Sequence, residues 1–337
     1  MQKEEIINLF NSFNRLNVLI IGDVMVDAYL WGKVDRISPE APVPIVTVRS
    51  RENRLGGAAN VALNIKAMGA NPILCSVIGN DQKGKEFIGL LLEQKMETKG
   101  ILVSNERVTT TKFRVIGNKM QMLRVDEETD KLLGKTEYDG FIETFHSLME
   151  EKKIDVVIFQ DYDKGVISEE LIKEVVKLAV KKGIPVAVDP KKRNFNAYKG
   201  VTLFKPNLKE LKDGLNIEIN PGDVIQLQNA VNRLNQQLGT EMVLLTMSED
   251  GVLISYHNNG EKNYSVLPSH VRTISDVSGA GDTVISVASL CLALKTNPEI
   301  LAAIANLAGG LVCEKPGVVP VDKQQLLNET FKLSLGS

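Results

Sequence analysis

The sequence predicts an α/β fold: a doubly wound, mostly parallel sheet with helices on both faces and a small projecting β-sheet lid. Short apolar runs recur along the chain and alternate with helical patterns, as in consecutive βα units. Two segments interrupt this rhythm with proline-rich or alternating sequence. No repeat, low-complexity tract or composition shift divides the chain, so we expect one domain over residues 1–337.

Strands of the main sheet are expected where apolar residues follow one another without a break, because a parallel strand is buried on both faces. The first such run covers residues 17–23 and ends in Gly-Asp. Four later runs have the same character: 72–79, 154–159, 185–189 and 242–246. Ligands bind outside the carboxyl ends of such strands, so polar residues near these ends are candidates. They are Asp23, Asp27, Asp161, Asp189 and Thr246.

Helices are expected between these runs. In residues 57–68 the apolar positions repeat at intervals of three and four. Residues 168–182 begin with a capping serine and two glutamates and stop at Gly183. Such segments connect successive parallel strands across the faces of the sheet.

Two segments, about residues 33–50 and 108–126, predict the small projecting sheet. The first contains three prolines, too many for a helix, and ends in the β-branched run 44–48. The second alternates on either side of a Gly-Asn turn at 117–118, as a hairpin does. Together they form either a peripheral extension of the fold or a lid over the ligand site.

The composition argues against several classes of protein. The chain has 337 residues, and 40 Lys and Arg against 42 Asp and Glu give a net charge of −2, without the basic excess of many nucleic-acid-binding proteins. Uncharged runs such as 300–313 are shorter than the ~18 residues of a membrane span. The charged N-terminus does not resemble a secretory signal, and three cysteines make a disulfide framework unexpected. We expect no nucleic-acid or membrane partner, no zinc site and a cytoplasmic location.

The most specific motif is DVSGAGDT at residues 276–283, followed by an apolar helical run. Gly279 and Gly281 allow a tight turn with outward N–H groups, and the dipole of the following helix favours an anion there. Asp282 lies in the first turn of that helix. The motif is either an anion hole beside a functional carboxylate or a glycine-rich loop in which Asp282 is a common N-terminal helix residue.

Two further clusters are weaker on their own. LGGAANVA at residues 55–62 carries Asn60 one turn into a helix, and its glycines allow either ligand approach or close packing. KPNLKE at residues 205–210 places Asn207 and Glu210 on one helix face, where their oxygens suit Mg²⁺ and its waters. Without further support the same pair indicates a capping box. Residues 79–86 come close to a P-loop, but Glu86 stands where the hydroxyl is needed.

In their order along the chain, these motifs resemble those of the ribokinase-like (PfkB) carbohydrate kinases. The segments are GD…D at 22–27, GGAAN at 56–60, DYDKG at 161–165, PNLKE at 206–210 and DVSGAGD at 276–282. The resemblance covers about residues 17–322 and implies the ribokinase-like form of the fold. RISPEAPVP at 36–44 is further similar to the D-glycero-D-manno-heptose-7-phosphate kinases. In many bacteria that kinase is fused to a nucleotidyltransferase domain with a His-x-Gly-His motif. No such motif is present here, so the chain resembles the stand-alone form of the kinase. Gln160 and Ser278 depart from the usual Ser and Thr of the family.

The resemblance implies ATP-dependent phosphorylation of the anomeric O1 of the heptose 7-phosphate to the 1,7-bisphosphate, in ADP-heptose and lipopolysaccharide core precursor synthesis. It implies that Asp282 is the general base and that the N–H groups of Gly279, Ala280 and Gly281 stabilise the transferring phosphoryl group. The remaining residues follow by their implied role. Asn207 and Glu210 hold Mg²⁺ through water; Thr246, Gly251 and Asn306 contact the nucleotide; Asp27, Gly56, Gly57 and Asn60 bind the sugar; Asp161, Lys164, Asp189 and Lys191 are further pocket candidates.

The family also implies a homodimer formed through the lid, and in many members a monovalent cation such as K⁺ beside the glycine-rich turn, which Asp276 could join. The distal phosphate of the sugar needs cationic donors. Lys112 and Arg114 share a face of the predicted hairpin, because strand side chains repeat every two residues. Arg36, Arg124 and Lys164 are further candidates, and each of these cations is alternatively a solvated surface charge.

Three alternatives stay open. Another PfkB kinase could act on a fructose phosphate or ribose. A non-catalytic sugar-binding regulator would not need Asp282 beside an anion hole. A nucleoside kinase would want an apolar platform for the base, and the lid offers only Trp31 and Phe113.

Overall fold

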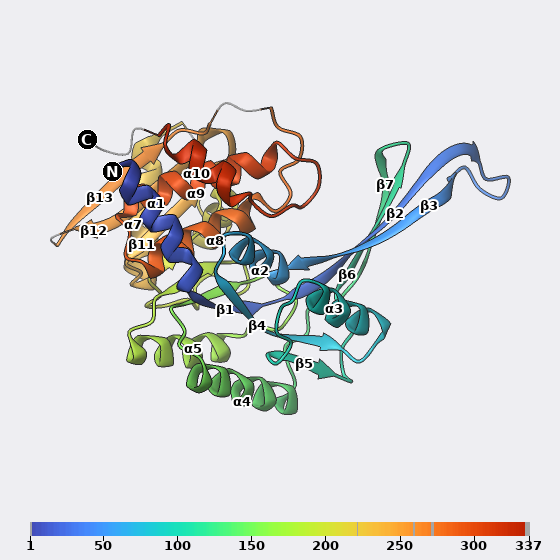
Figure 1. The fold of residues 1–337 in the computed structure, drawn as a ribbon, viewed down its shortest axis with the longest axis horizontal. Coiled ribbons are helices and arrows are strands. Elements are labelled where there is room, and N and C mark those ends of the chain that lie inside the picture. The colour runs from blue at the N-terminus through green and yellow to red at the C-terminus, as the bar shows by residue number, and fades with distance from the viewer. Residues whose placement is uncertain (1, 221, 259, 271–272, 334–337) are drawn as a thin grey trace.

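The computed structural model describes residues 2–220, 222–258, 260–270 and 273–333, and it confirms the predicted doubly wound α/β fold (Figure 1). Within these ranges the main sheet has nine strands. Their spatial order is β13 (Glu261–Leu267), β12 (Val252–Asn258), β11 (Met242–Thr246), β10 (Leu203–Phe204), β9 (Val186–Asp189), β8 (Val156–Gln160), β1 (Asn17–Gly22), β4 (Asn71–Gly79) and β5 (Ile101–Ser104). The strands from β11 to β5 in this order are parallel, and β12 and β13 add an antiparallel edge.

Helices cover both faces of this sheet. One face carries α1 (Lys3–Ser12), α2 (Ala58–Ala67), α3 (Gln82–Glu93), α8 (Ala280–Ala293), α9 (Pro298–Cys313) and α10 (Lys323–Thr330). The other carries α4 (Lys135–Glu151), α5 (Glu169–Lys182), α6 (Leu208–Leu215) and α7 (Val224–Leu238). As predicted, Ser168 caps α5 and Gly183 ends it with φ +67°. No helix in the described part of the chain has both the length and the apolar character that crossing a bilayer requires.

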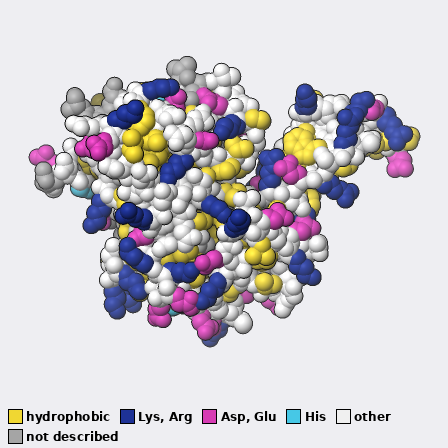
Figure 2. Space-filling view, viewed as in Figure 1, with side chains coloured by type: hydrophobic (Ala, Val, Ile, Leu, Met, Phe, Trp, Pro, Cys, Tyr) yellow, Lys and Arg dark blue, Asp and Glu magenta, His cyan; other side chains and the backbone are white. Residues whose placement is uncertain are grey.

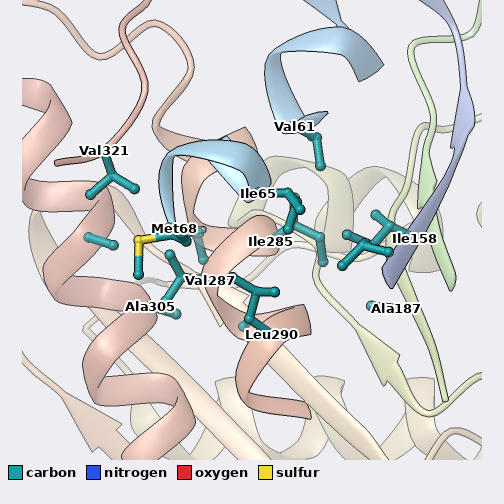
Figure 3. Packing of buried hydrophobic residues seen from close by; sticks show 14 of the residues in the cluster. Val61, Ile65, Met68, Ile158, Ala187, Ile285, Val287, Leu290, Ala305 and Val321 are labelled. Atoms are coloured by element: carbon teal, nitrogen blue, oxygen red, sulfur yellow. The ribbon is translucent and has the colours of Figure 1, made fainter. Parts of the chain in front are cut away.

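Each face of the sheet has its own apolar core. Val18 and Ile20 of β1 point into one core and Leu19 and Ile21 into the other, and all four are 0% exposed. This two-sided burial explains the unbroken apolar runs in the sequence. Figure 3 shows the first core, where side chains of α2 and α8 pack together over β8 and β9.

The lid is a separate four-stranded sheet that projects from the body (Figure 1). Its order is β3 (Pro44–Gly57), β2 (Val24–Ile37), β6 (Thr111–Gly117) and β7 (Met120–Glu127). The predicted hairpin is confirmed, with Asn118 and Lys119 at positive φ in its turn. The predicted bounds of the first segment are too short, because β2 begins at Val24 and β3 continues to Gly57. Residues such as Val26 and Ala28 are buried in the apolar core of the body, so the inner ends of these strands belong to the body as well as to the lid.

Candidate active site

Buried polar residues gather at the carboxyl ends of the central strands, beside the amino end of α8. Asp23 follows β1, Gln160 and Asp189 end β8 and β9, and Lys205 follows β10. All four residues are at most 5% exposed. Because parallel strands end at one edge of the sheet, residues far apart in sequence meet there. The lid begins at the same edge, since β2 starts directly after Asp23.

The glycine-rich turn leads directly into α8. Gly279 is the N-cap with φ +80°, a conformation that favours glycine, and a Cβ there would lie 3.0 Å from Asn60 Nδ2. A Cβ on Gly281 would lie 3.7 Å from Lys205 Nζ, so the turn is next to this ammonium group. The Ala280 N–H donates back to the Val277 carbonyl at 3.3 Å. An anion at the turn would therefore meet the helix dipole and a buried cation.

The Asp282 carboxylate is buried at this turn, with the residue 6% exposed. Asn60 Nδ2 donates to Oδ2 at 2.6 Å. The Tyr162 hydroxyl donates to Oδ1 at 2.8 Å, and Gln160 Nε2 donates to the same oxygen at 3.2 Å. Asn60 is expected among the sugar-binding residues, and in the structure its Nδ2 lies on the Asp282 carboxylate.

The surroundings of Asp282 shift its proton affinity. Burial and the charge of Asp189 raise the pKa of Asp282 to about 6, against the opposing effect of the hydrogen bonds from Asn60 and Tyr162 and of the Lys205 charge. A carboxylate with this pKa can accept a proton in the neutral range. The site thus combines a proton acceptor with an anion-binding turn.

Lys205 is a site residue that the sequence analysis did not select. Its Nζ lies 3.0 Å from Asp189 Oδ2, and the lysine is 2% exposed. Its backbone N–H donates to the Val188 carbonyl, which fixes it beside β9. A lysine at the end of a buried apolar run must find a charged partner, and that signal was available in the sequence.

The DYDKG segment forms the loop between β8 and α5. Asp161 lies inside the protein and is 1% exposed. Its Oδ2 accepts hydrogen bonds from Asn194 Nδ2 at 3.0 Å and from the Tyr198 hydroxyl at 2.8 Å. Its Oδ1 accepts from the Asp163 N–H at 2.8 Å. These contacts give Asp161 a role in supporting the loop that carries Tyr162.

Two predicted pocket lysines are paired with carboxylates. Lys164 Nζ lies 2.8 Å from Glu128 Oε1, in the segment that follows the lid. Lys191 pairs with Glu210 and lies 6.0 Å from the centre of the Tyr162 ring. Lys164 therefore belongs to the loop around Tyr162, and Lys191 lies beside the Tyr162 ring.

One face of the lid carries charged and aromatic side chains. Arg114 Nη1 lies 2.5 Å from Asp27 Oδ1, in a largely buried ion pair. The guanidinium groups of Arg114 and Arg54 lie 5.3 and 4.8 Å from the centre of the Tyr29 ring. A Cβ on Gly56 would lie 2.4 Å from Asp27 Oδ2, so any larger residue here would have to displace the Asp27 side chain. The sequence analysis selected Asp27, Gly56 and Arg114 but missed Arg54.

This face of the lid points toward the glycine-rich turn. Arg54 Nη1 would be 3.0 Å from a Cβ on Gly317, and the Gly317 N–H donates to Asp276 Oδ2 at 3.0 Å. Lys112 pairs in register with Asp27 and is shielded from water, which lowers the pKa of its ammonium group. The predicted shared face of Lys112 and Arg114 is confirmed by the alternating register of β6 against β2.

Asn207 and Glu210 form the capping box that opens α6. Asn207 Oδ1 accepts from the Glu210 N–H at 2.8 Å, and Glu210 Oε2 accepts from the Asn207 N–H at 2.9 Å. The other Glu210 oxygen faces Lys191. Asn207 also pairs with Thr246 at the end of β11. The oxygen donors have the chemistry for Mg²⁺ through water, whereas in the described ranges no group of three or more His, Cys, Asp or Glu is placed to hold a metal ion directly.

A cleft of about 790 Å³ opens beside this capping box. Asn207 and Thr246 line it, together with Lys192, Lys209 and Lys212. The other two predicted nucleotide residues lie further along the chain. Gly251 has φ +84°, and a Cβ there would lie 2.1 Å from the Leu267 carbonyl oxygen. Asn306 Nδ2 donates to the Pro268 carbonyl at 2.9 Å.

Comparison with known proteins gives the family. The profile of the pfkB family carbohydrate kinases matches residues 15–324. The chain belongs to the PfkB family of carbohydrate kinases. This PfkB kinase is accordingly a phosphotransferase that uses an alcohol group as acceptor, as the sequence analysis predicted.

Curated relatives of this PfkB kinase carry the name bifunctional protein HldE. The protein from Desulfatibacillum aliphaticivorans is 39% identical over 314 residues, which are 93% of this chain and 63% of the relative. The protein from Campylobacter fetus is 36% identical over 319 residues, 95% of this chain and 67% of the relative. The chain thus spans about two thirds of their length. Their two-function name gives no support to the expected stand-alone form.

Solved structures confirm the ribokinase-like fold. Phosphofructokinase-2 from Escherichia coli in complex with potassium has a TM-score of 0.76 at 18% identity, over 94% of this chain and 99% of that one. Arabidopsis thaliana ribokinase complexed with ribose and ATP has a TM-score of 0.68 at 16% identity, over 95% and 100%. At these identities the likeness concerns the fold alone.

Proposed function

We propose that this PfkB kinase transfers the terminal phosphoryl group of ATP to the anomeric O1 of D-glycero-D-manno-heptose 7-phosphate, in ADP-heptose and lipopolysaccharide core precursor synthesis. The proposal rests on the HldE relatives, 36–39% identical over most of the chain, and on the RISPEAPVP segment. The observation that carries the sugar-phosphate part is the lid face where Arg54 and Arg114 flank Tyr29, each paired with a lid carboxylate, Glu52 and Asp27. Since the chain spans part of its relatives, the proposal concerns the kinase reaction alone.

In the proposed reaction the sugar O1 attacks the terminal phosphorus, an O1–P bond forms, and the bond from that phosphorus to the ADP oxygen breaks. The O1 proton passes to the Asp282 carboxylate. The backbone N–H groups of Gly279 and Gly281, the α8 dipole and Lys205 stabilise the charge on the moving phosphoryl group, and the Ala280 N–H joins them when it gives up its 3.3 Å bond to the Val277 carbonyl. Burial and, to a smaller extent, the Asp189 charge raise the pKa of Asp282, so that this carboxylate is basic enough to take the proton.

Asn207, Thr246, Gly251 and Asn306 are the proposed nucleotide-binding residues. Mg²⁺, when bound, would neutralise phosphate charge near Asn207 and Glu210. Potassium in the E. coli phosphofructokinase-2 structure makes a monovalent cation near Asp276 part of the same proposal.

The distal phosphate of the sugar is proposed to bind at the lid. Arg114, Arg54 and Lys112 offer guanidinium and ammonium donors on the face that meets the glycine-rich turn. Arg114 is neutralised by Asp27 in the ligand-free arrangement, so a sugar phosphate would take over part of that pairing. Asp27 is then free to accept sugar hydroxyls.

We further propose that two copies pair through their lids. Apolar side chains are exposed on the projecting strands, as Figure 2 shows in yellow on the arm. They are Ile37, Val48, Met120, Met122, Leu123 and Val125, together with Val43 in the connection between β2 and β3. A projecting sheet with open edges and such side chains is stable in water when it is covered. Light scattering at micromolar concentration is expected to give the mass of a dimer, and a monomer would refute the pairing.

Asp282→Asn tests the base. The variant is expected to fold and bind ATP but to lose about 10²–10⁴-fold in kcat, because the O1 proton has no acceptor. Asp322→Asn, at the N-cap of α10, is a matched control that should keep full activity. Retention of more than about a tenth of wild-type kcat in Asp282→Asn would leave the residue with a structural role only.

Glu210→Gln separates capping from Mg²⁺ binding. Gln can keep the capping-box contact but lacks the negative charge. The expected result is a nearly unchanged melting temperature and a clear rise in the Mg²⁺ concentration for half-maximal rate. A large loss of stability with unchanged Mg²⁺ dependence would contradict the metal role.

Arg114→Ala tests the distal phosphate. KM for heptose 7-phosphate should rise and KM for ATP stay nearly constant, because a charge-assisted contact of about 1.5–3 kcal/mol implies about tenfold or more in kcat/KM. Exposed Arg233 of α7 supplies the control, Arg233→Ala. ADP release is measured with heptose 7-phosphate, the dephosphorylated heptose, fructose 6-phosphate and ribose.

Two outcomes would overturn the 7-phosphate assignment and leave the kinase assignment standing. One is equal use of the dephosphorylated heptose. The other is that Arg114→Ala and Lys112→Ala both leave the kinetics unchanged. If the enzyme preferred fructose 6-phosphate or ribose in the panel, that sugar would replace heptose 7-phosphate as the assigned substrate, and the kinase would stay within the PfkB family.

A further inference from the structure

The loop of residues 161–166 connects the buried carboxylate to the lid. At one end of this connection the Tyr162 hydroxyl donates to Asp282 Oδ1 at 2.8 Å. Gln160 Nε2 donates to the same oxygen, so two donors occupy Oδ1. Oδ2 receives one, from Asn60. A carboxylate oxygen accepts about two hydrogen bonds. Tyr162 and Gln160 together fill Oδ1, so Oδ2 is the oxygen that can accept a further donor.

The backbone of this loop is held by Asp23. Its carboxylate accepts hydrogen bonds from the N–H groups of Tyr162 at 2.9 Å, Val166 at 3.0 Å and Lys164 at 3.2 Å. Asp23 is 2% exposed, and no step of the proposed phosphoryl transfer uses it. It directly precedes β2, the first strand of the lid. The position of the loop is therefore tied to the start of the lid.

The other lid connections contact the same loop. Arg107, just before β6, donates from Nη2 to the Lys164 carbonyl at 2.5 Å. Glu128, directly after β7, pairs with Lys164 Nζ at 2.8 Å. Gly165 packs closely on the segment that follows Glu128 in the chain, and a Cβ on Gly165 would lie 1.9 Å from the Lys131 carbonyl oxygen. Three of the four points where lid strands join the body thus meet one short loop.

We propose that Tyr162 is a positioning residue that orients the Asp282 carboxylate, and that the loop of residues 161–166, anchored by Asp23, transmits the position of the lid to this carboxylate. The inference rests on the proposed role of Asp282 as the base. When the lid lies on a sugar, Asp23, Arg107 and Glu128 hold the loop so that the Tyr162 hydroxyl stays on Oδ1, and a lid that moves away loosens this contact. The carboxylate is then set for proton transfer only when the lid is in place.

The electrostatics around the pair give this proposal a measurable signature. Asp189 and Lys205 face Asp282 from β9 and β10, Asp27 acts on Tyr162 from the lid, and Lys191 lies near the Tyr162 ring. Burial and the nearby Asp282 keep the pKa of Tyr162 well above its usual range, so it remains a donor. Its hydrogen bond favours the charged carboxylate, and its removal raises the pKa of Asp282 above about 6.

Tyr162→Phe is compared with Tyr198→Phe in a pH–rate profile, using the sugar that the substrate panel selects. Both changes remove a buried hydroxyl from a carboxylate, but Tyr198 donates to Asp161 and not to Asp282. For Tyr162→Phe the acid limb of kcat/KM should move up by about one pH unit, so the rate at pH 6 falls about fivefold, the loss approaches about tenfold at lower pH, and it shrinks at higher pH. Tyr198→Phe should leave the limb in place. An unmoved limb in Tyr162→Phe overturns the positioning role.

The connection to the lid is tested by Glu128→Gln. Loss of this ion pair should lower kcat by about twofold to fivefold without changing KM for ATP. Glu97→Gln removes a comparable surface pair, with Lys152, far from the lid and should change neither value. Equal kinetics of the two variants would overturn the coupling.

Activity retained in Asp282→Asn would instead show that the base assignment fails, whereas an inactive Asp282→Asn with an unmoved limb in Tyr162→Phe would show that the inference alone fails.

Discussion

A carboxylate taken out of water must be surrounded by donors or by positive charge, and Asp282 imposes this requirement on the whole site. Its partners come from α2, from the end of β8 and from the loop after it, and the Asn60 contact spans 222 positions in sequence. Lys205 adds positive charge from the end of β10. The first turn of α8 is therefore held at this edge of the sheet by α2, by the end of β8 and by the loop after β8.

Three cations of the site are already paired with carboxylates. Asp27 holds Arg114, Glu210 holds Lys191, and Asp189 holds Lys205. A ligand with phosphate groups enters by exchanging partners with such pairs rather than by meeting free charges. Recognition then depends on how well the ligand replaces each internal partner, and a ligand that breaks a pair without replacing it leaves a buried charge uncompensated.

The sequence predicted what depends on local pattern. Apolar runs gave the parallel strands, Ser168 and Gly183 gave the ends of α5, and the alternation around residues 117–118 gave the lid hairpin. It also selected Asp282 and the glycine-rich turn. It could not assign Asn60 to Asp282 or pair Lys205 with Asp189, because these contacts depend on how distant segments meet. Arg54 was missed because β3 extends further inward than its proline-rich start suggests.

The pairing of β2 with β6 has a consequence for the order of folding. The two strands are parallel neighbours in the lid, yet their Asp27 and Arg114 lie 87 positions apart in the chain. The segment between them builds α2, β4, α3 and β5 of the body. Contacts between such distant segments form slowly, because the loop between them must first be ordered. During synthesis the long β2–β3 hairpin therefore cannot pair with β6 until α2, β4, α3 and β5 have been made. Until then the apolar residues of the hairpin stay exposed.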